Sequence, residues 1–274
     1  MIPPSRSWVL GEFAGTFLLV FTGCGVVATA VLTGAQVGIF QVAIVWGLGI
    51  AGAIYLTAAL SGAHLNPAVT LALVACRKFP PARAAGYVLT QFLGALVAAG
   101  LLHLLFAGVL AGYEARHGIV RGAAGSEASA MIFGEFFPNP GGQPLTVAAR
   151  ATVSSGQAFL VELTGTALLV LVILGVTDDR NGARPRELVA PVIGLTVTVL
   201  ISLFGPLTMA GFNPARDLAP RVFSALAGWG TVPFAANGWG WLTVYVLAPC
   251  VGGLAGSLIY VGFFRPAYAA AKQP

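Results

Sequence analysis

Six long stretches of the chain are almost free of charged residues, and each is long enough to cross a lipid bilayer as a helix. They run from Trp8 to Gly38, Ile39 to Cys76, Ala84 to Gly112, Gln157 to Thr177, Leu188 to Pro214 and Trp239 to Phe264. With 57% hydrophobic and only 8% charged residues, the chain has too few charges to cover a soluble globule of 274 residues. We therefore expect an all-α membrane protein with six transmembrane helices.

The amino end places Arg6 before an apolar run, which is also typical of a cleaved signal peptide. Glu12 interrupts that run and the same segment recurs later in the chain, so we interpret it as the first span. Cys24, Cys76 and Cys250 lie in apolar stretches without metal-ligand spacing. We expect no disulfide framework, no metal site, no cofactor and no catalytic residues.

The cations are distributed unevenly between the two sides that six spans define. With the amino end inside, the ends and even-numbered loops hold Arg6, Arg77, Lys78, Arg83, Arg180, Arg184, Arg186, Arg265 and Lys272. The opposite side holds Arg116, Arg121, Arg150, Arg216 and Arg221. Because positive residues favour the cytoplasmic side, we expect both termini in the cytoplasm. Anionic lipid is a sufficient partner for these cations, and no nucleic-acid partner is expected.

An internal repeat organises the chain. The run from Glu12 to Val20 matches the run from Glu162 to Val170, and Asn66-Pro67-Ala68 recurs as Asn213-Pro214-Ala215. The segment 91–94 similarly corresponds to 249–252. We infer one domain over 1–274, with halves 7–110 and 155–264 joined by an extracellular loop, 111–154. Each half has three spans, an odd number, so the halves cross the membrane in opposite senses as an inverted repeat.

Each half also contains a break rich in Gly and Pro before its Asn-Pro pair. An Asn followed by Pro is typical of a helix cap and the first helical residue, so we predict re-entrant half-helices beginning at Pro67 and Pro214. The extended backbone before them is tolerable at membrane depth only where it is buried or lines a wet cavity. The simpler alternative is a pair of ordinary proline kinks.

The segments Ser61–Thr70 and Gly211–Asp217 resemble the two signature loops of the aquaporin superfamily. The resemblance extends over nearly the whole chain, including Trp46–Gly49 and Thr177–Asp179. It implies the aquaporin fold: six tilted helices, two half-helices meeting at the bilayer midplane and one pore per subunit. It also implies a homotetramer in the cell membrane.

Physical chemistry suggests what such a site does. Two half-helix amino ends at the midplane repel cations, and the Asn66 and Asn213 amides donate hydrogen bonds that interrupt a proton wire. The backbone carbonyls before each cap line the pore with acceptors. These lining residues are Gly62, Ala63, His64, Leu65, Met209, Ala210, Gly211 and Phe212.

Three kinds of charged residue lie close to these loops. Arg216 is the one strong charge beside the second triplet, and we predict a pore-filter role for it rather than snorkelling to the interface. Asp217 either compensates the helix dipole or contributes to solute-size selection. Glu12 and Glu162 could relay protons, but we expect them to brace the broken loops by accepting backbone N–H groups.

Comparison with the aquaporin family places a selectivity filter at Trp46, Ile201, Ala210 and Arg216. Asp217 and Arg221 match the glycerol-conducting branch, which implies glycerol and water as permeants. Glycerol facilitators have Gly at the Ile201 position, Phe at the Ala210 position and Pro at the Tyr245 position.

Unless Phe212 replaces the missing ring, the filter is similar to that of plant nodulin-like intrinsic channels. Urea, ammonia and neutral metalloid hydroxides are then alternative permeants. An ion-coupled transporter shares the inverted repeat and broken helices, but it needs an ionisable coupling group, for which only Glu12 and Glu162 are available.

Overall fold

The computed structural model describes residues 6–36 and 38–271, and these residues form helices and loops without any β-strand. Six helical segments within them are long and apolar enough to span a membrane. They are α1 (Ser7–Thr33), α2 (Ile39–Ser61), α4 (Pro81–His117), α7 (Ser155–Val176), α8 (Val189–Thr208, preceded by the short η2, Arg186–Leu188) and a composite last span. That last span joins α11 (Gly240–Leu242), η4 (Thr243–Leu247), α12 (Ala248–Ile259), η5 (Tyr260–Phe264) and α13 (Arg265–Ala271).

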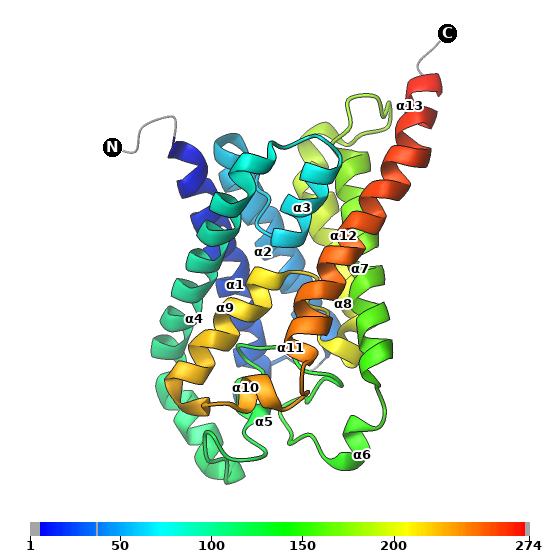
Figure 1. The fold of residues 1–274 in the computed structure, drawn as a ribbon. Coiled ribbons are helices and arrows are strands. Elements are labelled where there is room, and N and C mark those ends of the chain that lie inside the picture. Colours follow the sequence, from blue (N-terminus) through cyan, green and yellow to red (C-terminus); the bar gives the residue numbers. More distant parts are fainter. Residues whose placement is uncertain (1–5, 37, 272–274) are drawn as a thin grey trace.

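Two half-helices, α3 (Pro67–Ala75) and α9 (Pro214–Ser224), enter the bundle from opposite ends and approach each other near its middle (Figure 1). Each packs against a span of the other half, because α3 contacts α12 and α9 contacts α4. The predicted fold class, with six spans and two half-helices in an inverted repeat, is confirmed. Ordinary proline kinks are excluded, since an extended cap residue precedes both helices.

The helix ends differ in places from the apolar stretches. The second stretch divides into a span and a half-helix, with four loop residues and the Asn66 cap between them. The third span extends beyond Gly112 to His117, where Gly118 in a left-handed conformation ends it. Apolar composition ends before the helix does because Glu114, Arg116 and His117 form a final polar turn.

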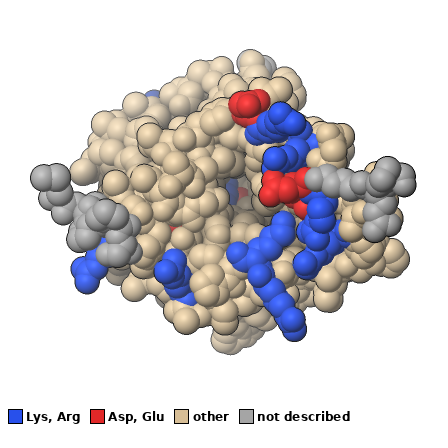
Figure 2. Space-filling view, turned by 90° about the horizontal axis from the view of Figure 1, so that it is seen from above, with Lys and Arg blue, Asp and Glu red and all other residues tan. Residues whose placement is uncertain are grey.

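Short helices cover the end of the bundle opposite the start of α1 and the end of α13. They are α5 (Glu127–Ala130), α6 (Val147–Arg150), η3 (Ala225–Trp229) and α10 (Val232–Ala235) (Figure 1). Seen from the other end, the molecule has a central hollow with Lys and Arg side chains gathered mainly to one side of it (Figure 2). Lys272, one of the cations assigned to that side, lies outside the described residues.

Glycines allow the helices of the two halves to cross closely. A Cβ on Gly47 of α2 would lie 2.5 Å from the Gly194 carbonyl oxygen of α8, and one on Gly194 would lie 2.2 Å from that of Gly47. Within the second half, a Cβ on Gly252 of α12 would likewise lie 2.2 Å from the Leu163 carbonyl oxygen of α7. Small residues permit such backbone approach in membrane helices. Large apolar side chains on the outside of the spans, such as Leu104, are exposed, as lipid contact requires.

Candidate pore

Both half-helices begin at a matched Asn cap. Asn66 Oδ1 accepts the backbone N–H of Ala68 at 2.8 Å, and Asn213 Oδ1 accepts that of Ala215 at 3.0 Å. The following prolines, Pro67 and Pro214, lack the N–H that would otherwise be left without a partner in the first turn. The amino ends of α3 and α9, each carrying roughly half a positive charge, therefore meet near the middle of the bundle.

The two Asn side chains also hold the loops together. The Asn66 amide donates to the Phe212 carbonyl at 2.8 Å, and the Asn213 amide donates to the Leu65 carbonyl at 2.8 Å. Each amide has two hydrogens, so this tie leaves a second one for a molecule beside it. Both Asn residues line a cavity, described below.

Carboxylates behind the loops hold the backbone before each cap. Glu12 accepts the N–H groups of His64 at 3.0 Å and Leu65 at 2.9 Å. Glu162 accepts those of Gly211 at 2.9 Å and Phe212 at 2.7 Å, and both carboxylates are fully buried. Each carboxylate thus accepts two backbone N–H groups of one loop, and these bonds turn the loop carbonyls away from the glutamates.

Strained backbone explains why such braces are needed. In the first loop Ala63 and Leu65 have φ of 50° and 51°, and in the second loop Met209, Ala210 and Phe212 have φ of 63°, 61° and 53°. Positive φ at a non-glycine residue costs about 1–3 kcal/mol and persists only where surrounding contacts fix it.

The loops line a cavity of about 190 Å³ whose walls extend to Thr177, directly after α7, and Val189, at the start of α8. This is the end where α1 begins and α13 ends, and where the space-filling view shows a central hollow (Figure 2). We call this cavity the termini-side cavity. Of the predicted lining residues, it contains Gly62, Ala63, His64, Leu65, Ala210, Gly211 and Phe212. The remaining one, Met209, lines a second cavity of about 260 Å³ at the opposite end, the loop-side cavity.

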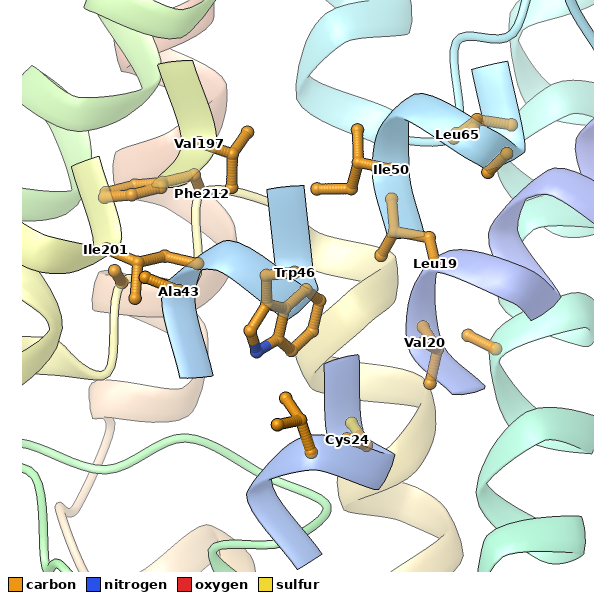
Figure 3. Packing of buried hydrophobic residues seen from close by; sticks show 14 of the residues in the cluster. Leu19, Val20, Cys24, Ala43, Trp46, Ile50, Leu65, Val197, Ile201 and Phe212 are labelled. Carbon is orange, nitrogen blue, oxygen red and sulfur yellow. The ribbon is translucent and has the colours of Figure 1, made fainter. Parts of the chain in front are cut away.

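Trp46, Ile201 and Arg216 line both cavities, so they lie where the two meet. All three are at least nine-tenths buried. Figure 3 shows the Trp46 ring on α2 between α1 and Ile201 of α8. Gly23 of α1 makes room for the indole, because a Cβ there would lie 2.2 Å from the ring. The fourth predicted filter residue, Ala210, lines the termini-side cavity alone.

Arg216 has an ion-pair partner that the sequence analysis missed. Its guanidinium lies 2.8 Å from the carboxylate of Glu135 and 4.3 Å from the centre of the Trp46 ring. Glu135 is fully buried and lines neither cavity, so it contacts Arg216 on the side that faces away from the cavities. The expectation of a single strong charge beside the second triplet was therefore wrong. Glu135 carries the signal that identified Glu12 and Glu162, an isolated acid in an apolar run.

Asp217 in the first turn of α9 and Arg221 in its last turn form a second buried ion pair, with N···O 2.7 Å. Asp217 also accepts the Glu135 backbone N–H at 2.7 Å, and Arg221 donates to the carbonyls of Glu135 and Pro233. Neither residue lines a cavity. The pair therefore holds the segment that carries Glu135 against α9. Asp217 in this way both compensates the helix dipole and helps to position the ion-pair partner of Arg216.

The Phe212 ring is fixed in place. A Cβ on Gly165 of α7 would lie 2.1 Å from the ring, and Phe204 packs edge-on with centroids 6.3 Å apart. His64 is buried beside Phe79 and Tyr87, and its Nδ1 lies 3.2 Å from the Thr70 hydroxyl.

Comparison with known proteins agrees with this architecture. The profile of the family described as Major intrinsic protein matches residues 4–260. A glycerol uptake facilitator protein of Haemophilus influenzae is 42% identical over 253 residues, covering 92% of this chain and 91% of that protein. A propanediol uptake facilitator of Citrobacter freundii is 38% identical over 256 residues, covering 93% of this chain and 91% of the relative.

Among solved structures, the aquaglyceroporin from Plasmodium falciparum superposes with a TM-score of 0.81 at 29% sequence identity, covering 96% of this chain and 98% of that one. The fold and the site thus define a multi-pass membrane protein whose inverted repeat surrounds two cavities that meet at Trp46, Ile201 and Arg216. The chain belongs to the major intrinsic protein family. The resemblance to aquaporins, and within them to the glycerol-facilitator branch, is confirmed.

Proposed function

We propose that this protein is a passive membrane channel that conducts glycerol and water and excludes protons and other ions. The observation that carries the proposal is the junction of two cavities at Trp46, Ile201 and Arg216. Glycerol and propanediol, the solutes for which the relatives are named, are small neutral alcohols.

The junction suits a small polyol because its walls differ in chemistry. Trp46 and Ile201 offer apolar surface to C–H groups, and Arg216 offers a fork of N–H donors to hydroxyl oxygens. The loop carbonyls accept from the hydroxyl hydrogens. A neutral solute thus exchanges hydration for matched contacts, whereas a bare ion does not.

Ion exclusion follows from the arrangement of charge. The positive amino ends of α3 and α9 repel cations, and the Asn66 and Asn213 amides require a passing oxygen to accept rather than donate. Arg216 faces the passage while its counter-charge, Glu135, stands behind it. Arg216→Ala should therefore preserve solute flux and raise proton and cation leak, and an unchanged leak would count against this role.

A broader range of neutral solutes is the second candidate function. Ile201 at the junction and Ala210 in the adjoining termini-side cavity are both aliphatic, and the Phe212 ring, held against Gly165, lines the termini-side cavity but not the loop-side cavity. Urea, ammonia and neutral metalloid hydroxides fit such a junction. This observation favours their passage in addition to that of glycerol.

The charge distribution supports an orientation with both termini in the cytoplasm of a cell membrane. We further propose a homotetramer surrounded by lipid, with one pore in each subunit and no catalytic activity, metal or cofactor. Cross-linking in native membranes tests the assembly, and a product no larger than a monomer opposes it.

Stopped-flow shrinkage of proteoliposomes tests conduction. Vesicles with the protein should take up glycerol and exchange water faster than protein-free vesicles. The rate of urea uptake measures whether the channel also conducts neutral solutes other than polyols. Equal glycerol and water rates with and without protein would refute the channel.

A further inference from the structure

Two tyrosines occupy matched positions of the inverted repeat and make the same hydrogen bond. Tyr87 of α4 donates to the carbonyl of Ser61 at 2.9 Å, and Tyr245 of η4 donates to the carbonyl of Thr208 at 3.1 Å. Ser61 is the last residue of α2 and Thr208 is the last residue of α8. Each acceptor lies five residues before its half-helix Asn. The repeat therefore provides a hydroxyl donor at the point where each span passes into its loop.

The carbonyl at the end of each span needs a hydrogen-bond donor. The last carbonyls of a helix receive no N–H from within the helix, and a buried carbonyl without a donor is costly. The strained loop begins directly after it, with Met209 and Ala210 at positive φ in the second half. A hydroxyl that fixes the Thr208 carbonyl therefore fixes the starting direction of the peptide that reaches Ala210.

The two tyrosines differ in what their loops reach. Two residues after Thr208 lies Ala210, and one residue after it lies Met209, which line the two cavities on either side of the junction. The loop after Ser61 lines the termini-side cavity alone, through Gly62 and Ala63. Tyr245 thus acts on backbone that lines both cavities beside the junction, and Tyr87 acts on backbone that lines the termini-side cavity only.

Contacts of the rings reinforce this difference. Tyr245 is 1% exposed, and its ring centre lies 5.4 Å from the Arg221 guanidinium and 6.3 Å from the ring of Phe137. The Thr208 hydroxyl continues the network to Glu162 at 2.6 Å. Tyr87 instead stacks on Trp8 at 5.0 Å and lies 4.6 Å from Phe79.

We infer that Tyr245 is a positioning residue for solute selectivity, acting through the Thr208 carbonyl on the loop at the cavity junction, and that Tyr87 is its counterpart without influence on selectivity. The inference rests on the proposed function, since it concerns how that channel discriminates among polyols. Tyr245 does not line either cavity, so its effect passes through the backbone that it holds.

The matched variants Tyr245→Phe and Tyr87→Phe each remove one hydroxyl and keep the ring. The readout is the ratio of glycerol to erythritol permeability in the same proteoliposomes, which does not depend on how many channels are present. We expect Tyr245→Phe to change this ratio at least about twofold, a difference of roughly 0.4 kcal/mol. Tyr87→Phe should change both permeabilities by one common factor. A wild-type ratio in Tyr245→Phe, or an equal change of ratio in both variants, overturns the inference.

Hydrogen–deuterium exchange gives a second readout that works at low yield. Peptides covering 205–216 should exchange faster in Tyr245→Phe, and peptides covering 58–68 faster in Tyr87→Phe, with the rest of each protein unchanged. Faster exchange throughout the protein would indicate a merely structural role and oppose the inference. If the wild-type protein conducts neither polyol, the proposed function fails; if it conducts and the ratio does not respond, only the inference fails.

Discussion

Removing the Glu135 carboxylate should destabilise the protein through Arg216. The guanidinium is 4% exposed and its ion-pair partner lies at 2.8 Å, so Glu135→Ala leaves a buried charge without compensation. Such a loss costs about 3–5 kcal/mol. With roughly 2–4 °C per kcal/mol for a chain approaching this size, the unfolding temperature should fall by on the order of 10 °C.

Glu135→Gln provides a graded comparison. The amide keeps an oxygen near Arg216 and loses the charge, so the expected cost is about 1.5–3 kcal/mol, the value of a hydrogen bond to a charged group. Tryptophan fluorescence during heating in detergent measures the order of the three proteins. The wild type should unfold last and Glu135→Ala first.

The functional part of the prediction concerns the freed guanidinium. Without Glu135 behind it, Arg216 is held over Trp46 alone, and glycerol flux should fall. Glu127→Ala is the control, because this buried acid of the same loop pairs with Arg150 and lines neither of the two pore cavities. Its flux should equal that of the wild type. Wild-type unfolding temperature and flux in Glu135→Ala would refute the reasoning.

Three further predictions concern other parts of the molecule. Gly47→Ala should lower stability by about 1–3 kcal/mol, because the new Cβ would lie 2.5 Å from a carbonyl oxygen of α8. Gly52→Ala, with open space around the new Cβ, should not lower stability, and equal unfolding temperatures of the two variants would contradict this expectation. Ala210→Phe should narrow the termini-side cavity and so favour glycerol over bulkier solutes, and an unaltered permeability ratio would contradict this expectation. Burial opposes ionisation of Asp178, but hydrogen bonds from Arg180 and Tyr260 prevail and hold the pKa of that carboxyl well below its usual range. The stabilisation by the Asp178 carboxylate is thus present above about pH 4 and lost as the pH falls toward the folded-state pKa. Asp178→Asn should therefore unfold at a lower temperature than the wild type at pH 7, and the two unfolding temperatures should converge at low pH. An equal difference in unfolding temperature at both pH values would refute the assignment.

The half-helices were predictable because their cause is local. Asn followed by Pro specifies a cap and a first helical residue within two positions, and both caps form as expected. Glu12 and Glu162 were recognisable because an acid inside an apolar span needs polar partners, and the broken loop is the nearest source of N–H groups.

The remaining features depend on chain segments far apart in the sequence. Glu135 reaches Arg216 only because the loop between the halves folds back over α9. Tyr245 looks like an ordinary span residue until the fold places its hydroxyl at the end of α8. The extra turn of α4 beyond Gly112 was missed because its polar residues end the apolar stretch, not the helix.

The most direct test of a passive channel is glycerol flux into proteoliposomes under imposed ion gradients. A channel conducts at the same rate whether proton and sodium gradients are inward, outward or absent, and glycerol equilibrates without accumulating. An ion-coupled transporter, with Glu12 or Glu162 as its coupling group, would accumulate glycerol against its gradient. We predict identical initial rates under all three conditions. A rate that follows the ion gradient, or accumulation of glycerol driven by it, would contradict the account.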